Sequence, residues 1–241
     1  MNSMRVARRT GLGLAALLVA VAFSLAGWLP KAAQARQDNS FSRANTLLFL
    51  TNHLKNVKKS IILQYAFVKR GPLEAAYKGS IGMAVSVIRS GEKNVNFKYF
   101  TGARSQYVPP MSDVHGNPII SLFLQRDATD MERRTGGSAR YFQDAIKVAL
   151  ESSAKVNPVK LNYAGHIVNG KRITFAPYVN DPHRNELGQF TKKHYIFTLS
   201  KAVPGGVYQL RTVVPSESGQ HSDQMNALVE ETLTFAGTEP L

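Results

Sequence analysis

The hydrophobic pattern of this chain takes a helical period in one segment, residues 117–151. Apolar side chains recur there at spacings of three and four, as they do in helices that bury one face. Asn117 and Pro118 suit the start of a first helix, and Gly136 suits its end. Ser138 then offers an N-cap for a second helix. The pattern therefore predicts a pair of helices joined by a turn that contains two glycines.

Before and after the helix pair, large apolar residues alternate with other residues at a period of two, which is typical of β-strands. The segments with this alternation are 61–68, 81–88, 95–99, 159–163, 195–199, 208–214 and 229–235. Asn169-Gly170 is a dipeptide that favours two-residue hairpin turns. We expect it to join a strand ending near Ile167 to one that starts near Ile173.

These elements predict an α+β domain, in which strands from both sides of the helix pair share one curved antiparallel sheet of roughly eight strands. Residues 39–59 have an amphipathic pattern that predicts an N-terminal helix packed on this sheet. Both faces of the first two strands are largely apolar. We therefore expect helices to cover one face of the sheet, and the other face to curl around a core or a cavity.

The N-terminal segment has the organisation of a secretory signal peptide. Three arginines precede an uncharged apolar run over residues 11–29, and a small-residue A-x-A sequence ends at Ala35. We expect cleavage near Ala35, which removes residues 1–35 and leaves a single periplasmic domain of residues 36–241. The alternative is an uncleaved anchor in the inner membrane, because residues 11–29 approach the ~20 residues that span a bilayer.

The chain is strongly basic, with 30 Lys and Arg against 16 Asp and Glu, a formal net charge of +14. The first 35 residues carry four positive charges and no negative one, so 14 − 4 leaves +10 on the expected mature domain. For an exported protein this charge favours anionic envelope surfaces as partners, and we expect no nucleic acid. The chain has no cysteine, which excludes disulfides, lipid attachment at cysteine and thiol catalysis.

No strong catalytic or cofactor-binding signature is present. The six histidines lack the spacing of metal sites, and there is no G-x-S-x-G motif. Asp127, Asp130 and Glu132 each have an arginine nearby, so we interpret them as ion-pair partners rather than as a catalytic pair. We therefore predict no catalytic residue, no bound metal and no cofactor.

Four arginines on the helix pair are the candidate binding residues: Arg126, Arg133, Arg134 and Arg140. Guanidinium groups match phosphate and carboxylate groups well, so these side chains would form an anion-binding rim beside the double-glycine turn. The alternative interpretation is a solvated helix face. It rests on the spacing of four residues that relates Asp130 to two of the arginines and Arg140 to Asp144.

Several short motifs are spread over nearly the whole mature chain. They are HGNP at 115–118, LFLQRD at 122–127, MER at 131–133, TGGS at 135–138, YF at 141–142 and AVPGGV at 202–207. Together they resemble an uncharacterised family of exported proteobacterial proteins of similar length. The resemblance implies a periplasmic location and a single domain, and it implies no activity.

Our leading hypothesis is a non-enzymatic periplasmic protein that binds or carries an apolar or amphipathic ligand, such as a hydrophobic small molecule or an anionic lipid. The apolar strands and the missing catalytic signature favour it. One alternative is an interaction module for an envelope complex, which would contact a protein partner through the arginine rim. A second alternative is an exported hydrolase whose site combines His115 or His183 with a distant aspartate.

Overall fold

The computed structural model describes residues 41–216 and 227–241. The expected signal peptide, its alternative as a membrane anchor and the expected cleavage at Ala35 all lie outside these residues. None of the helices in the described ranges combines the length and the apolar character that a membrane span requires.

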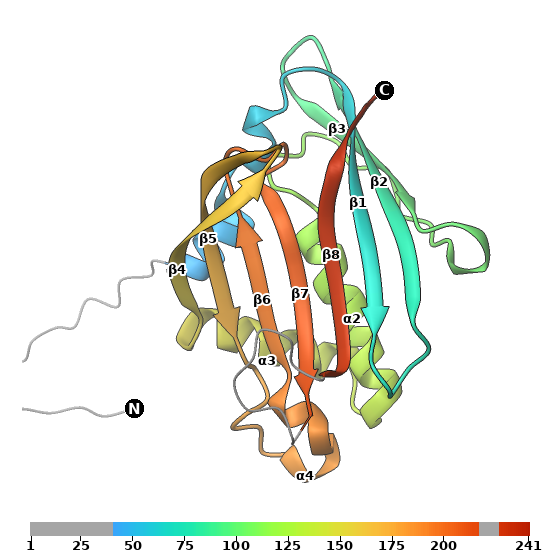
Figure 1. The fold of residues 1–241 in the computed structure, drawn as a ribbon, viewed down its shortest axis with the longest axis vertical. Coiled ribbons are helices and arrows are strands. Elements are labelled where there is room, and N and C mark those ends of the chain that lie inside the picture. Colours follow the sequence, from blue (N-terminus) through green and yellow to red (C-terminus); the bar gives the residue numbers. More distant parts are fainter. Residues whose placement is uncertain (1–40, 217–226) are drawn as a thin grey trace, which may run out of the picture. The chain divides into compact units, whose positions relative to one another are not determined.

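The described part of the chain forms one antiparallel sheet of eight strands, as the alternating segments predict. The strands are β1 (Ile61–Arg70), β2 (Tyr77–Val87), β3 (Lys93–Tyr99), β4 (Lys155–Tyr163), β5 (His166–Phe175), β6 (His194–Leu199), β7 (Val207–Pro215) and β8 (Ala227–Pro240). Their order across the sheet is β3-β2-β1-β8-β7-β6-β5-β4, so the sheet is open (Figure 1). The C-terminal strand β8 lies between β1 and β7 and thereby joins the strands before the helices to those after them.

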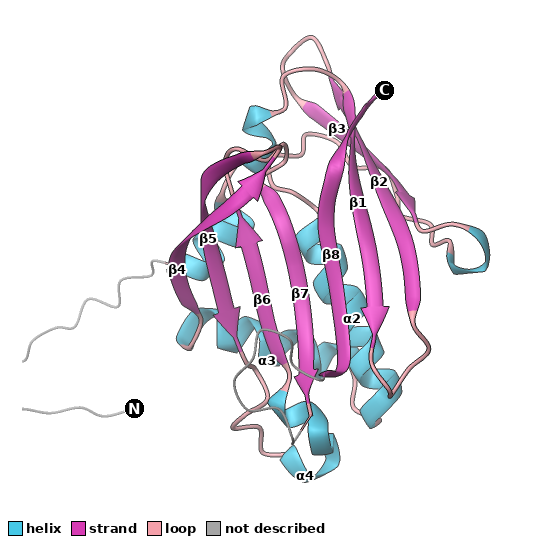
Figure 2. Cartoon of the chain, viewed as in Figure 1, coloured by secondary structure: helices cyan, strands magenta, loops and turns pink. Residues whose placement is uncertain are grey.

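The sheet is curved, and the helix pair packs against one of its faces (Figure 2). The pair consists of α2 (Ile119–Thr135) and α3 (Ala139–Ser152), which confirms the segment 117–151. Gly136 has a left-handed φ of 75° and ends α2, and the Ser138 hydroxyl accepts the Tyr141 N–H at 3.2 Å to cap α3. At Gly137 a glycine leaves space for the Phe142 ring, because a Cβ there would lie 2.8 Å from that ring.

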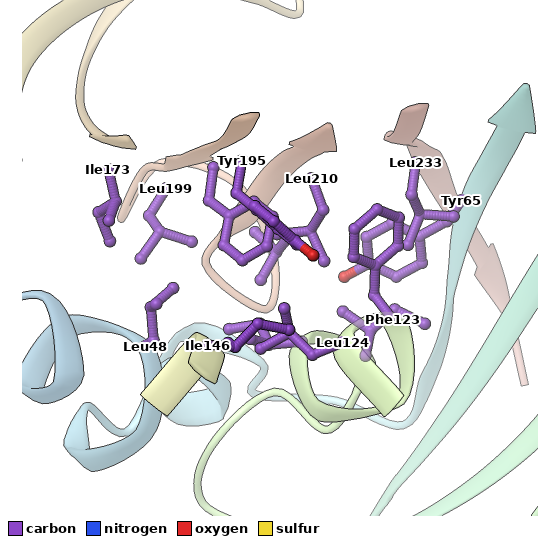
Figure 3. Close-up of a cluster of buried hydrophobic side chains, with 14 of the residues drawn as sticks. Leu48, Tyr65, Phe123, Leu124, Ile146, Ile173, Tyr195, Leu199, Leu210 and Leu233 are labelled. Atoms are coloured by element: carbon purple, nitrogen blue, oxygen red, sulfur yellow. The ribbon is translucent and has the colours of Figure 1, made fainter. Parts of the chain in front are cut away.

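The space between the helices and strands β5 to β8 is filled by the protein's own side chains. Figure 3 shows sheet residues facing helix residues across this layer: Ile173, Tyr195, Leu199, Leu210 and Leu233 opposite Leu48, Phe123, Leu124 and Ile146. All of them are buried, and six are at most 2% exposed, which is the packing of an ordinary domain core. The layer between the helices and these strands is therefore part of an ordinary packed core.

The N-terminal helix is present but much shorter than the predicted 39–59. It consists of α1 (Arg43–Asn45) and a π-helical turn, η1 (Thr46–Leu50), and a separate 3-10 turn follows, η2 (His53–Asn56). The backbone becomes extended at Thr51. The side chain of Asn56 donates to the Val203 carbonyl at 2.7 Å and accepts from the Gly205 N–H at 3.0 Å. These tertiary hydrogen bonds hold the segment in a shape that a continuous helix would not allow.

The predicted hairpin turn at Asn169-Gly170 is wrong. The strands β4 and β5 are joined by Ala164 and Gly165, with φ of 50° and 80°, and a two-residue turn of type I′ requires such positive values at both positions. Gly170 lies inside β5 opposite Val159. It is needed there because a Cβ would lie 2.9 Å from the Leu199 carbonyl oxygen of the neighbouring strand.

Candidate functional site

A pocket of about 910 Å³ lies at the ends of strands β1, β2 and β3, between α2 and the loop that follows β3. This loop carries a short 3-10 turn, η3 (Gly102–Arg104), and projects at the right of Figures 1 and 2. The lining comes from four parts of the chain: the β1–β2 end (Lys69, Leu73, Glu74, Ala75, Tyr77), the end of β3 (Tyr99, Phe100), the loop (Ala103 to Val108) and α2 (Leu122, Gln125, Arg126, Thr129, Asp130, Arg133). The volume lies in the range of small-molecule sites.

Aromatic side chains form one wall of the pocket. The Phe100 ring lies 4.9 Å from the ring of Tyr99, 5.2 Å from Phe67 and 5.6 Å from Tyr77, measured between centroids. Phe100 is buried although its φ of 61° is uncommon for a residue with a side chain. Gly79 makes room for this cluster, because a Cβ there would lie 2.5 Å from the Tyr77 hydroxyl oxygen.

A second wall, in contact with the aromatic one, is an ionic network between α2 and β1, β8 and the β1–β2 loop. Its cations are Lys69, Arg126, Arg133 and Arg134, and its carboxylates are Glu74, Asp130 and Glu231. Burial favours the neutral form of Asp130, but hydrogen bonds from Arg133 and the charges of Lys69 and Arg134 outweigh it and lower the pKa of Asp130. All three carboxylates have lowered pKa values and are ionised at neutral pH.

Glu231 is the most deeply buried member of this network, with its side chain 2% exposed. Burial opposes its ionisation, and the charges of Arg126 and Lys69 nevertheless lower its pKa. The Arg126 guanidinium lies 2.6 Å from the Glu231 carboxylate and stacks on the Phe67 ring, with Cζ 4.5 Å from the centroid. Arg126 therefore connects the ionic wall to the aromatic wall.

The four predicted binding arginines do not form one rim. Arg126 and Arg133 line the pocket, and Arg134 belongs to the same network without lining it. Arg140 stands apart on α3, where its side chain is exposed and pairs with Asp144 at 2.9 Å. Each of the four has a carboxylate partner, and anion binding by them stays a prediction.

Sequence reasoning missed the aromatic wall and one cation at the mouth of the pocket. The Arg104 guanidinium stacks on Tyr77, with Cζ 4.3 Å from the ring centroid. Among the described residues Arg104 has no carboxylate within ion-pair distance. Burial raises the pKa of Tyr99 to about 12, so this phenol stays protonated beside the cations.

A second polar cluster is buried between α2 and β6, away from the pocket lining. The Lys193 ammonium and the Tyr195 hydroxyl each lie 2.5 Å from the Asp127 carboxylate, and Tyr178 lies 3.1 Å from Tyr195. Burial raises the pKa of Asp127, with the charge of Lys193 opposing it. Because none of these residues lines the pocket, we assign the cluster to the positioning of α2 on the sheet.

The two histidines considered for a hydrolase are exposed and do not line the pocket. His115 Nδ1 lies 3.1 Å from the backbone oxygen of Asp113, and His183 Nδ1 lies 3.4 Å from the Glu186 carboxylate. Within 41–216 and 227–241, no three histidine, aspartate or glutamate side chains are placed to hold a metal ion.

Neither a family model nor a curated protein sequence matches this chain. Solved structures that are similar to it include the following three. Lipoprotein LppX of Mycobacterium tuberculosis is 11% identical, with 83% of this chain and 98% of LppX covered and a TM-score of 0.34. MucB is 12% identical over 81% of this chain and 57% of MucB, with a TM-score of 0.36. A LolA superfamily protein of Nitrosomonas europaea is 8% identical over 82% and 93%, with a TM-score of 0.23. None of these values shows a family or a function for this chain.

Proposed function

We propose that this protein binds a single-chain amphipathic molecule in the pocket between α2 and the loop after β3, with the chain on the aromatic wall and the head near the charged residues. The observation that carries the proposal is the pocket itself, whose lining combines apolar and aromatic residues with charged ones. Small-molecule sites commonly combine an apolar lining with a few placed polar groups.

The mouth of the pocket supports this proposal, because it leaves large apolar side chains in contact with water. Tyr107 is 84% exposed and Leu73 is 40% exposed, and both line the pocket. An apolar ligand chain that covers them removes this surface from water, which is favourable by roughly 25 cal/mol per Å².

The cell envelope is the location that we propose for this binding. The expected signal peptide of residues 1–35 would export the domain of residues 36–241, and its charge of +10 would draw it to anionic lipids. A carrier that hands its ligand on between envelope sites is consistent with an open pocket. We propose this role without a catalytic step.

The interaction-module hypothesis has less support from the geometry. It treats the four arginines as one exposed rim, whereas Arg140 stands apart and the other three are paired with carboxylates on neighbouring elements. An arginine that already has such a partner must give it up, or share it, before it binds an anion on another protein.

Filling the pocket should weaken ligand binding. N-phenyl-1-naphthylamine is a neutral apolar dye whose fluorescence rises in apolar sites, so it reports on the pocket without depending on charge. We expect saturable binding to the domain of residues 36–241. Leu122→Trp replaces an aliphatic side chain of the lining with a larger indole ring and should weaken binding at least about tenfold.

Two further variants make this test specific. Ala103→Trp adds an indole on the exposed loop at the same pocket and should also weaken binding. It keeps the test valid if Leu122→Trp disturbs folding. Val148→Trp adds one on α3, where the side chain is 65% exposed and outside the lining, and should bind as the unmodified domain does. Absence of saturable binding, or equal binding by all variants, would contradict the proposal.

A further inference from the structure

The cations of the pocket differ in how far their charge is already neutralised. Lys69 contacts three carboxylates, and Arg126 is paired with Glu231 and stacked on Phe67. Arg133 pairs with Asp130 and Glu74. A ligand anion that approaches any of these groups also meets its carboxylate partner, so the ionic wall offers little net attraction.

Arg104 is the exception. It lines the pocket, is exposed, and within the described part of the chain has no carboxylate partner. Its guanidinium uses one face to stack on Tyr77. Stacking leaves the N–H groups at the edge of the guanidinium, and these are the donors that grip carboxylate or phosphate oxygens in a fork.

The loop that carries Arg104 is tied to the sheet, so the guanidinium is held at the mouth of the pocket. The Gln106 N–H donates to the Tyr99 carbonyl at 3.0 Å, and Met111 and Val95 exchange hydrogen bonds of 2.8 and 2.9 Å. Backbone pairing on both sides of the turn thus fixes its position relative to Tyr77. A positioned cation binds an anion with less loss of entropy than a mobile one.

We propose that Arg104 selects ligands with an anionic head, and that the ligand class is a single-chain lipid whose head carries a phosphate or carboxylate group and a net negative charge. This inference rests on the proposed function, because it assigns the head of the same ligand. The head lies against the Arg104 fork at the mouth, and the chain follows the aromatic wall toward Leu122. The predicted arginines of α2 shape the pocket, and Arg104 supplies the unneutralised charge.

The test compares two lysolipids of equal chain length as competitors of N-phenyl-1-naphthylamine, at concentrations below micelle formation. Both heads contain a phosphate, but that of lysophosphatidylglycerol is anionic, whereas the choline ammonium of lysophosphatidylcholine neutralises the head overall and is repelled by Arg104. The unmodified domain should bind lysophosphatidylglycerol more tightly. Arg104→Gln should weaken the affinity for lysophosphatidylglycerol about tenfold, the loss expected for one charged hydrogen-bonding pair. It should change the affinity for lysophosphatidylcholine less than about twofold.

Arg140→Gln is the matched control, because it removes the same charge from an exposed arginine outside the pocket. It should leave the affinities for both lysolipids unchanged. The role of Arg104 would be overturned if Arg104→Gln lost the same affinity for both lysolipids. It would also be overturned if Arg140→Gln lost as much affinity for lysophosphatidylglycerol as Arg104→Gln does. Equal affinity of the unmodified domain for the two lysolipids would overturn anion selection while leaving the pocket as a ligand site. Failure of the dye to bind at all would overturn the proposed function too.

Discussion

Replacing Lys193 with methionine is expected to lower the free energy of unfolding by about 3 kcal/mol or more. Lys193 is the cation that pairs with Asp127, at 2.5 Å, and both side chains are buried. Without it, the Asp127 carboxylate keeps the Tyr195 hydroxyl as its hydrogen-bond donor and has no compensating charge. Breaking one side of a buried ion pair costs more than the pair itself contributes, since the remaining charge stays desolvated.

Thermal unfolding followed by circular dichroism measures this effect. For a domain of about 200 residues, 3 kcal/mol corresponds to a fall in Tm of about 6–12 °C. The double variant Asp127→Leu, Lys193→Met removes both charges and should recover much of the loss. Lys147→Met, which removes an exposed lysine paired with Asp144, should leave Tm nearly unchanged. An unchanged Tm in Lys193→Met would refute a structural role for this pair.

Asn117→Leu is expected to destabilise the domain by about 2–3 kcal/mol. The Asn117 side chain is buried where α2 begins, and its Nδ2 donates to the Tyr65 hydroxyl at 2.9 Å and to the Gly205 carbonyl at 2.8 Å. Its Oδ1 accepts the Ile119 N–H at 3.2 Å. Leucine satisfies none of these groups and leaves them buried without partners, which is the costly outcome for polar groups.

Chemical denaturation of the variant and of Asn96→Leu separates this cause from a general effect of adding leucine. Asn96 is exposed on β3, so its replacement leaves no buried polar group unpaired and should change stability by less than about 0.5 kcal/mol. Equal losses in the two variants would contradict the role assigned to Asn117.

The helix pair and most strands could be predicted from the sequence because their signals are local. The spacing of three and four in α2 and α3, and the alternation in β1, follow directly from which face each element buries. Gly136 has the left-handed φ that its place in the pattern suggests. The pattern within one element follows from the periodicity of that element. Such an element can therefore be predicted without knowledge of its tertiary contacts.

The errors come from contacts between distant segments. Gly170 follows an asparagine and looks like part of a turn, yet its role is to let the Leu199 carbonyl of β6 approach. The actual turn uses Ala164 at a positive φ, which alanine rarely adopts and the sequence does not signal. Likewise, the helix predicted over 39–59 is interrupted at Thr51, and beyond this break the Asn56 side chain binds the turn before β7.

The candidate site was less accessible to sequence reasoning than the fold. The i,i+4 spacing correctly pairs Asp130 with Arg134 and Arg140 with Asp144. It also relates Arg126 to Asp130, but the ion-pair partner of Arg126 is Glu231, which lies 105 residues later on β8. The aromatic wall combines residues of β1, β2 and β3, and only the sheet order brings them together.

One core cluster extends along the sheet, and the pocket lies beside it. Buried apolar side chains of β1, β2 and β3 belong to the same cluster as those of β5 to β8. The pocket is lined by residues at the ends of β1, β2 and β3, by the loop after β3 and by α2. The ionic network joins α2 to β1 and β8. A ligand in the pocket would therefore lie at the margin of this core.

The most direct test of the account is to map where an anionic lysolipid binds by nuclear magnetic resonance of the isotope-labelled domain of residues 36–241. We predict that lysophosphatidylglycerol shifts the backbone amides of Tyr77, Tyr99, Phe100 and Arg104, which line the pocket, and leaves those of β4 and the exposed face of α3 unchanged. Saturable shifts confined to α1, α3 or β4, or no saturable shifts at all, would contradict the assignment of this pocket as the ligand site.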